Sequence, residues 1–206
     1  MLYETDRINE FKITTGRFSM LRKWLTFILL VILTSCSPYK RYRTIDDNFW
    51  KRNRGAEPTI NIGYLDIQAA GDSRKTRTNL MSSIVFHLKS RGFSVTDLRD
   101  YSGLLEGKDL PQTRRLSDKE VLLLAGSIKE RFLFQGVYQE TTQFAIPADL
   151  TSVSLAISVY DARTGKHVGE FRLYGTELKD YNLLSVFNLT ERFADDFHSA
   201  FQEGSK

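Results

Sequence analysis

The chain has 206 residues, of which 41% are hydrophobic and 26% are charged. This composition is typical of a globular protein and excludes a disordered or fibrous chain. Its single cysteine excludes an intrachain disulfide, so that stability must come from a hydrophobic core. The formal net charge of +4 is only mildly basic.

The first feature along the chain is an export signal that ends at Cys36. Arg22 and Lys23 precede an apolar run over Trp24–Ile32, and small residues follow, which together are the three parts of a secretory signal. The ending Leu33-Thr34-Ser35-Cys36 resembles a bacterial lipobox. This resemblance implies cleavage before Cys36 and a diacylglycerol on its thiol. We therefore expect a signal peptide over residues 1–35 and a membrane anchor at Cys36.

Two other interpretations of the apolar run are a transmembrane anchor and a buried core helix. A comfortable span needs about 20 apolar residues, and this run is shorter. A core helix fits poorly because the run is apolar on all sides and Ser37-Pro38 follows it. Residues 1–19 form a long polar leader, which predicts that Met20 is the real start. Ser37, in place of an aspartate, favours the outer membrane by analogy with lipobox families.

Residues 36–57 are predicted to be a flexible basic tether after the lipidated cysteine. This stretch is rich in cations that can contact anionic headgroups, at about 1 kcal/mol each; they are Lys40, Arg41, Arg43, Lys51, Arg52 and Arg54. Its aromatic residues are expected at the membrane interface rather than against nucleic-acid bases; they are Tyr39, Tyr42, Phe49 and Trp50. A nucleic-acid partner is not expected for an exported protein.

Residues 58–206 are predicted to be a single α/β domain of two or three layers, with a mixed sheet of about five strands and two main helices. The first half contains a strand at 59–67, a helix at 76–90 that ends at Gly92, and a second strand at 93–96. Strand, helix and strand in this order predict a crossover unit with parallel strands. Residues 97–118 form an irregular segment, with a helical turn near 101–105.

The second half begins with Val121–Ile128, in which both the odd and the even positions carry apolar residues. This pattern predicts a central strand that is covered on both faces of the sheet. An extension of this strand to Phe134 is left open. A polar loop or edge segment is expected at 135–150. Strict alternation over 153–160 and 167–176, around a turn with Gly165, predicts a hairpin. Val168 fits the alternation only if Gly169 marks a bulge. A helix with a phenylalanine-rich stripe is expected at 183–201.

The sequence predicts no catalytic, cofactor-binding or metal-binding residues. The histidines His87, His167 and His198 do not have metal-ligand spacing, and Asp195, Asp196 and His198 are interpreted as a solvated helix face. Ser82 and Ser83 carry no nucleophile motif. Gly107-Lys108 and Gly165-Lys166 lack the rest of a phosphate loop. Cys36 remains the single predicted functional residue, as the site of lipidation.

Two segments resemble a known group of bacterial envelope proteins. They are Val121–Ile128, an apolar run that ends in Gly-x-Ile, and Ile157–Lys166, which contains Asp-x-x-Thr-Gly. Both are similar to segments of relatives of the curli secretion-channel lipoprotein. The fold also resembles the amino-terminal domain of the Tol-system propeller protein and a lipoprotein that activates a peptidoglycan synthase. The resemblance implies a binding or assembly protein without catalytic residues.

Three functions follow from these observations. The first is a non-catalytic accessory factor, anchored in the envelope through Cys36, that binds another envelope protein through the loops at 104–116 and 135–150. The second is a ring-forming channel subunit and therefore a homo-oligomer, although the long inserted hairpins of channel members have no counterpart here. The third, and least favoured, is a hydrolase that uses Asp66, Asp195 or His198.

Overall fold

A computed structural model describes residues 39–52, 59–69, 72–144, 150–178 and 182–203. Cys36, the signal peptide and Arg54 lie outside the described residues. The described strands are β1 (Tyr39–Ile45), β2 (Thr59–Gln68), β3 (Ser94–Asp97), β4 (Phe132–Gln143), β5 (Leu150–Asp161) and β6 (His167–Leu178). The described helices are α2 (Asp47–Arg52), α3 (Ser73–Ser90), α4 (Ser102–Gly107), α5 (Asp118–Leu124) and α6 (Leu183–Glu203), with a 3-10 turn at Leu98–Tyr101.

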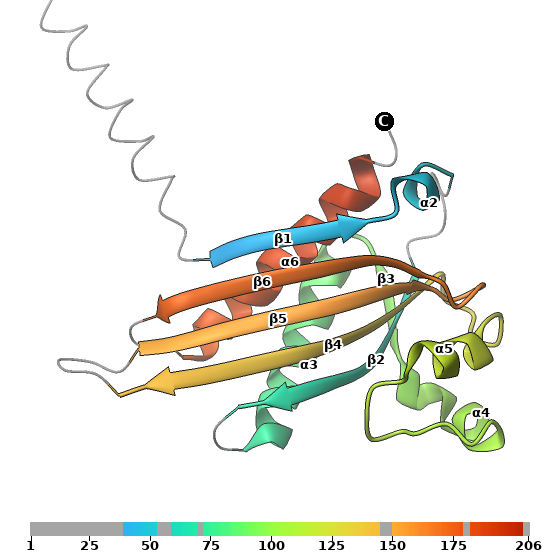
Figure 1. The fold of residues 1–206 in the computed structure, drawn as a ribbon, viewed down its shortest axis with the longest axis horizontal. Coiled ribbons are helices and arrows are strands. Elements are labelled where there is room, and N and C mark those ends of the chain that lie inside the picture. The colour runs from blue at the N-terminus through green and yellow to red at the C-terminus, as the bar shows by residue number, and fades with distance from the viewer. Residues whose placement is uncertain (1–38, 53–58, 70–71, 145–149, 179–181, 204–206) are drawn as a thin grey trace, which may run out of the picture. The chain divides into compact units, whose positions relative to one another are not determined.

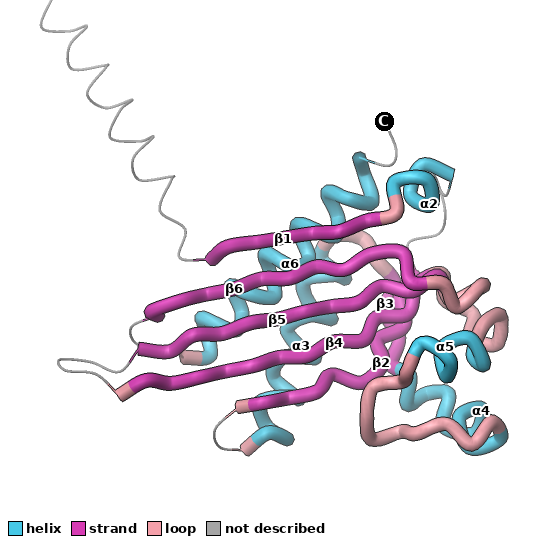
Figure 2. Tube along the Cα trace, in the orientation of Figure 1, coloured by secondary structure: helices cyan, strands magenta, loops and turns pink. Residues whose placement is uncertain are grey.

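The strands form one mixed sheet in the order β1-β6-β5-β4-β2-β3 (Figure 1). β2 is parallel to both β3 and β4, whereas the remaining neighbours are antiparallel. The helices α3 and α6 lie side by side on one face of the sheet (Figure 2). The predicted α/β fold with a mixed sheet is therefore confirmed, with six strands among the described residues in place of about five.

The main core fills the space between the sheet and these two helices. Aromatic rings from both layers meet there edge to face, with 4.8 Å between the centroids of Phe134 and Phe197 and 5.9 Å between those of Phe171 and Phe193. Such pairs contribute about 0.5–1.5 kcal/mol beyond the burial of their area. The predicted stripe of α6 is confirmed, since Val186, Leu189, Phe193, Phe197 and Ala200 are all buried.

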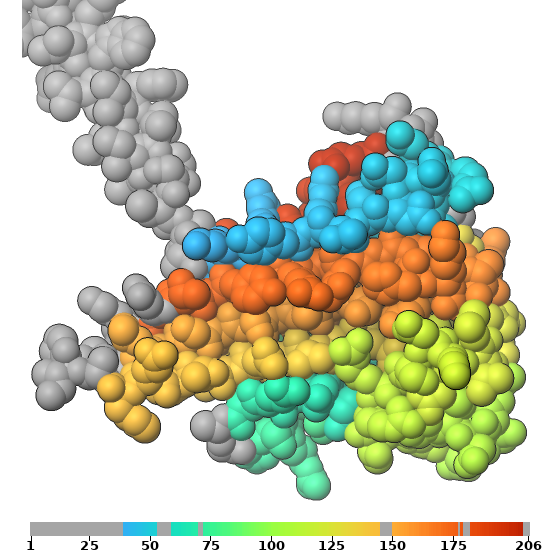
Figure 3. All heavy atoms as spheres, in the orientation of Figure 1, coloured from blue at the N-terminus to red at the C-terminus, as the bar shows by residue number. Residues whose placement is uncertain are grey.

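A smaller core lies on the opposite face, at one end of the sheet. There α4, α5 and the segment between them cover Leu133 and Tyr160 (Figure 3, green). The buried side-chain amide of Gln135 holds the segment between α4 and α5 against the sheet. It accepts a hydrogen bond from the Leu116 backbone N–H at 2.6 Å and donates one to the Leu116 carbonyl at 3.3 Å. No helix among the described residues covers the rest of this face (Figures 1 and 3).

Two local predictions are confirmed: the helix α3 and the hairpin of β5 and β6. The helix expected at 76–90 begins at Ser73, since Asp72 accepts hydrogen bonds from the backbone N–H groups of Arg74 and Lys75. The hairpin of β5 and β6 is present, and Gly165 adopts a φ of 68° in its turn. The pairing changes register between Val159 and Tyr160, so that Val168 is the extra residue of a bulge.

The strand predicted over Val121–Ile128 is wrong, because this run is the helix α5 followed by a turn. Ser117 and Glu120 form a capping box that starts the helix. Val121 and Leu124 are buried, while Leu122 and Leu123 are exposed. The polar segment predicted over 135–150 is also wrong, since β4 continues to Gln143 and β5 begins at Leu150. One of the two segments that carried the envelope-protein resemblance is therefore a helix and a turn.

Residues 39–52 are folded and do not form the flexible tether expected at 36–57. Tyr39–Ile45 is the edge strand β1, paired with β6, and Asp47–Arg52 is the helix α2. Trp50 is buried, stacks on Phe132 at 5.4 Å between centroids, and donates to the Val168 carbonyl at 3.1 Å. Phe49 and Trp50 thus belong to the core rather than to a membrane interface. Within the described residues, no helix is both long and apolar enough to span a bilayer.

Candidate functional site

A pocket of about 350 Å³ opens beside the second half of β2. β3 pairs with β2 only as far as Ile62, whereas β2 continues to Gln68. Beyond Ile62, no described strand pairs with this edge of β2, and the pocket lies along it. Its other walls come from the amino-terminal half of α3 and from the segment between Asp97 and Arg114. The short strand β3 therefore creates the pocket.

Three arginines line this pocket, and two of them are engaged by carboxylates. Arg99 contacts both carboxylate oxygens of Asp97, with distances of 2.6 to 3.0 Å. Arg114 forms two hydrogen bonds with Glu120, at 2.7 and 2.9 Å. Burial alone would raise the pKa of Asp97, but hydrogen bonds from the side chain and backbone of Arg99 outweigh it and hold the pKa below its usual value.

Arg77 is the third arginine of this pocket and remains available to bind the carboxylate of a ligand. Its Nε donates to the Leu65 carbonyl at 3.0 Å, and its guanidinium lies over the Tyr64 ring, 4.5 Å from the centroid. Within the described part of the chain, no carboxylate lies within ion-pair distance of Arg77. These two contacts fix the position of the guanidinium, and its terminal nitrogens form no hydrogen bond with any described residue. A fixed guanidinium is well suited to bind a carboxylate through two hydrogen bonds.

The remaining walls of the pocket combine apolar and polar side chains. Leu65, Met81, Leu98 and Leu105 supply the apolar part, and Thr78, Ser82, Gln112 and Thr113 supply the polar part. The combination of a strand edge that no described strand pairs with, a guanidinium without a described carboxylate partner and a lining with several apolar side chains fits an extended peptide that carries a carboxylate. Nothing in the sequence singled out Arg77 or Tyr64, because their meeting depends on where β3 ends. The predicted segment at 104–116 does contribute to the pocket, through Leu105 and residues 111–114.

The basic residues of the expected tether are partly neutralised in the fold. Arg41 forms an ion pair with Asp196 of α6 at 2.8 Å, and Arg43 forms one with Glu203. Burial raises the pKa of Asp196, although Arg41 opposes this shift. These contacts hold β1 against α6, so that Arg41 and Arg43 stabilise the fold instead of remaining free for headgroups.

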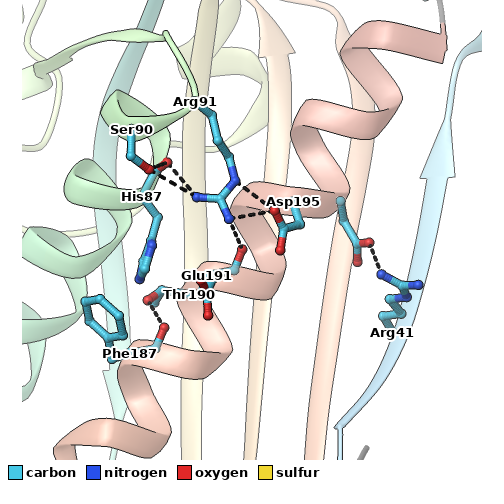
Figure 4. A network of polar contacts seen from close by, with 9 residues as sticks. Arg41, His87, Ser90, Arg91, Phe187, Thr190, Glu191 and Asp195 are labelled. Atoms are coloured by element: carbon cyan, nitrogen blue, oxygen red, sulfur yellow. Dashed lines mark hydrogen bonds and ion pairs between the residues drawn. The ribbon is translucent and has the colours of Figure 1, made fainter. Parts of the chain in front are cut away.

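The candidate hydrolase residues are not brought together. Asp195 pairs with Arg91, whose Nη2 lies 2.6 Å from the carboxylate and which also donates to the carbonyl of His87 at 2.9 Å (Figure 4). His198 lies 3.3 Å from the amide of Gln202 on the same helix. Asp66 is on β2, where its neighbours Leu65 and Ile67 take the core side of the strand. No group of three or more potential metal ligands occurs within the described ranges.

Comparisons with known proteins give structural likeness only. No protein-family model matches the sequence, and no curated protein sequence does either. The chain is similar to the PelC dodecamer from Paraburkholderia phytofirmans, at 13% identity and a TM-score of 0.48, over 75% of this chain and 93% of that one. It is also similar to lipoprotein GNA1162 from Neisseria meningitidis, at 11% identity and a TM-score of 0.46, over 68% and 98%. The LpoB carboxy-terminal domain from Escherichia coli gives 11% identity and a TM-score of 0.39, over 63% and 94%. These likenesses are distant, at 11% to 13% identity.

Proposed function

We propose that the chain is a lipid-anchored protein of the bacterial envelope that binds another envelope protein and catalyses no reaction. The observation that carries this proposal is the signal that ends in Leu33-Thr34-Ser35-Cys36, since it supplies both an export route and an anchor. Ser37 supports the outer membrane as the destination. Only two residues, Ser37 and Pro38, separate Cys36 from Tyr39, the first residue of β1. The domain is therefore held close to the membrane surface.

The pocket beside β2 is the proposed site for the partner. An extended segment can add to an unpaired strand edge through backbone hydrogen bonds, while side-chain pockets supply specificity. Arg77 would then bind an acidic side chain or a terminal carboxylate of that segment. The proposed partner is thus an envelope protein with an exposed, extended and acidic segment.

In-cell crosslinking of the tagged full-length protein tests this function, with mass spectrometry of the detergent-extracted complex. We expect a heterologous envelope protein in the complex, and we expect its yield to fall at least tenfold for Arg77→Ala. Arg163→Ala is the matched control, because Arg163 is an exposed arginine in the β5–β6 turn. Equal thermal stability of the two variants would show that loss of the complex is not loss of the fold.

Other outcomes separate the remaining functions. A complex that survives Arg77→Ala would remove the pocket as the binding site. A large complex of this chain alone would favour the ring-forming subunit. Extensive crosslinking that captures no other protein would contradict the accessory function.

A further inference from the structure

One end of the domain exposes large apolar side chains. Leu183 and Leu184, at the start of α6, are 62% and 63% exposed, and Phe144, directly after β4, is 89% exposed. We call these three residues the apolar end. The register places the end of β4 and the start of α6 at the same end of the sheet, since Gln143 pairs with Leu150, and Thr151 pairs with Leu178 shortly before α6 begins. Figure 1 shows these element ends on the same side of the domain. Soluble surfaces seldom collect large apolar groups without a partner that covers them.

The amino terminus of β1 lies at this same end. Tyr39 pairs with Gly175 near the end of β6, and its hydroxyl donates to the carbonyl of Ser185 in the first turn of α6 at 3.3 Å. The three peptide links from Cys36 to Tyr39 reach at most about 11 Å when fully extended. Covalent geometry therefore holds Cys36 within that distance of Tyr39, whatever path the intervening residues take. The chain therefore leads back to Cys36 from the end of the domain at which α6 begins.

Exposed cations accompany the apolar side chains. Arg74 and Lys75 are exposed in the first turn of α3, which follows the end of β2. Because β2 is parallel to β4 and Gln68 pairs with Gln139, α3 begins at the same end of the sheet as the apolar end. The nearby carboxylate of Asp72 is engaged in capping α3. Apolar residues bordered by cations are typical of surfaces that lie in the interface of an anionic bilayer.

We propose that the apolar end is seated in the headgroup region of the membrane as a second contact beside the lipid anchor. This inference rests on the proposed acylation of Cys36. The acyl chains hold the protein on the membrane, and the apolar end sets its orientation, with α3 and α6 starting at the bilayer. The turn between β5 and β6, at the opposite end of the strands, then points into the aqueous phase.

Site-directed spin labelling tests this orientation on the processed, lipidated protein in vesicles of phosphatidylethanolamine and phosphatidylglycerol. Acylation occupies the thiol of Cys36, the single cysteine, so that an introduced cysteine is the only thiol available to the label. Leu184→Cys places the label in the apolar end, and Arg163→Cys places it in the opposite turn. Both positions are exposed, and a label there leaves the core intact.

The measured quantity is the collision ratio, which is the collision rate of the label with oxygen divided by its collision rate with a water-soluble nickel chelate. We expect this ratio to be at least threefold higher at position 184 than at position 163. Equal collision ratios at the two positions would overturn the inference. Dipolar broadening between labels at position 184 would also overturn it, since a second copy of the chain would then cover the apolar end. The mass of Cys36 in the same sample separates the two proposals. An acylated Cys36 with a water-exposed label refutes only the orientation, whereas an unmodified Cys36 refutes both.

Discussion

Arg131 and Asp161 form a buried ion pair, with 3.1 Å between Nη1 and Oδ1 and with side chains that are only 7% and 6% exposed. The pair joins the residue before β4 to the last residue of β5. Asp161 also accepts hydrogen bonds from the Arg163 backbone N–H at 3.1 Å and the Thr164 hydroxyl at 2.8 Å. One carboxylate therefore holds both the sheet and the turn that follows β5.

Replacing Asp161 by alanine should lower the free energy of unfolding by about 3–5 kcal/mol, because the Arg131 guanidinium would stay buried without this counter-charge. Urea denaturation measures the loss. Glu170→Ala is the matched control, since Glu170 pairs with an exposed arginine, Arg172, and such pairs contribute about 0–1 kcal/mol. Similar losses for the two variants would contradict the role given to the buried pair.

Replacing Trp50 by alanine should cost about 3–5 kcal/mol, as for other large aromatic side chains in a core. Tyr42, on the neighbouring strand, is 61% exposed, and Tyr42→Ala should change stability by no more than about 0.5 kcal/mol. Thermal unfolding of both variants distinguishes a folded segment from a tether. If residues 39–52 were a tether, neither substitution would affect the unfolding transition.

Glu120 should titrate with a pKa of about 2, because hydrogen bonds from Arg114 and from Ser117 favour its ionised form. The folded pKa lies below the model-compound value of 4.5, so its contribution to stability is complete above that value and is lost as the pH falls toward 2. Carbon-detected NMR titration of the carboxylate measures this directly. Arg114→Ala should raise the midpoint, whereas Arg99→Ala should leave it unchanged; a midpoint near 4.5 in the unmodified protein would contradict the bidentate contact.

Gly136 should tolerate no side chain. A Cβ at this position would lie 2.5 Å from the Ile157 side chain and 2.8 Å from the backbone oxygen of Ala156. Gly136→Ala should therefore destabilise the fold by about 1–3 kcal/mol. Gly103, in α4, has no heavy atom within 4 Å of such a Cβ, and Gly103→Ala should be neutral or stabilising by up to about 1 kcal/mol. Calorimetric unfolding of the pair checks the packing of β4 against β5.

The hairpin of β5 and β6 and the helix α6 could be predicted because each buries one face of a regular repeat, which the bulge at Val168 interrupts only at the start of β6. The run Val121–Leu124 could not, since an apolar stretch of this length suits a buried strand and a buried helix equally. Its capping box, Ser117 and Glu120, was the signal that distinguishes the two. The edge strand β1 gave no apolar repeat, because Arg41 and Arg43 occupy its inner face and pair with acidic residues of α6.

The pocket was less predictable than the fold. The sequence predicts binding at two loops, 104–116 and 135–150, because loops tend to carry function. Part of the first loop lines the pocket, whereas no described residue of the second does and most of it belongs to β4. Arg77 and Tyr64 could not be identified, because their importance arises from the early end of β3, a tertiary property. The lipidation of Cys36 remains a prediction from the sequence.

The most direct test of this account is the intact mass of the protein extracted from the envelope with detergent. We predict a chain that begins at Cys36 and carries a diacylglycerol on the thiol. A chain that retains residues before Cys36, or an unmodified Cys36, would contradict the proposed anchor and with it the proposed location.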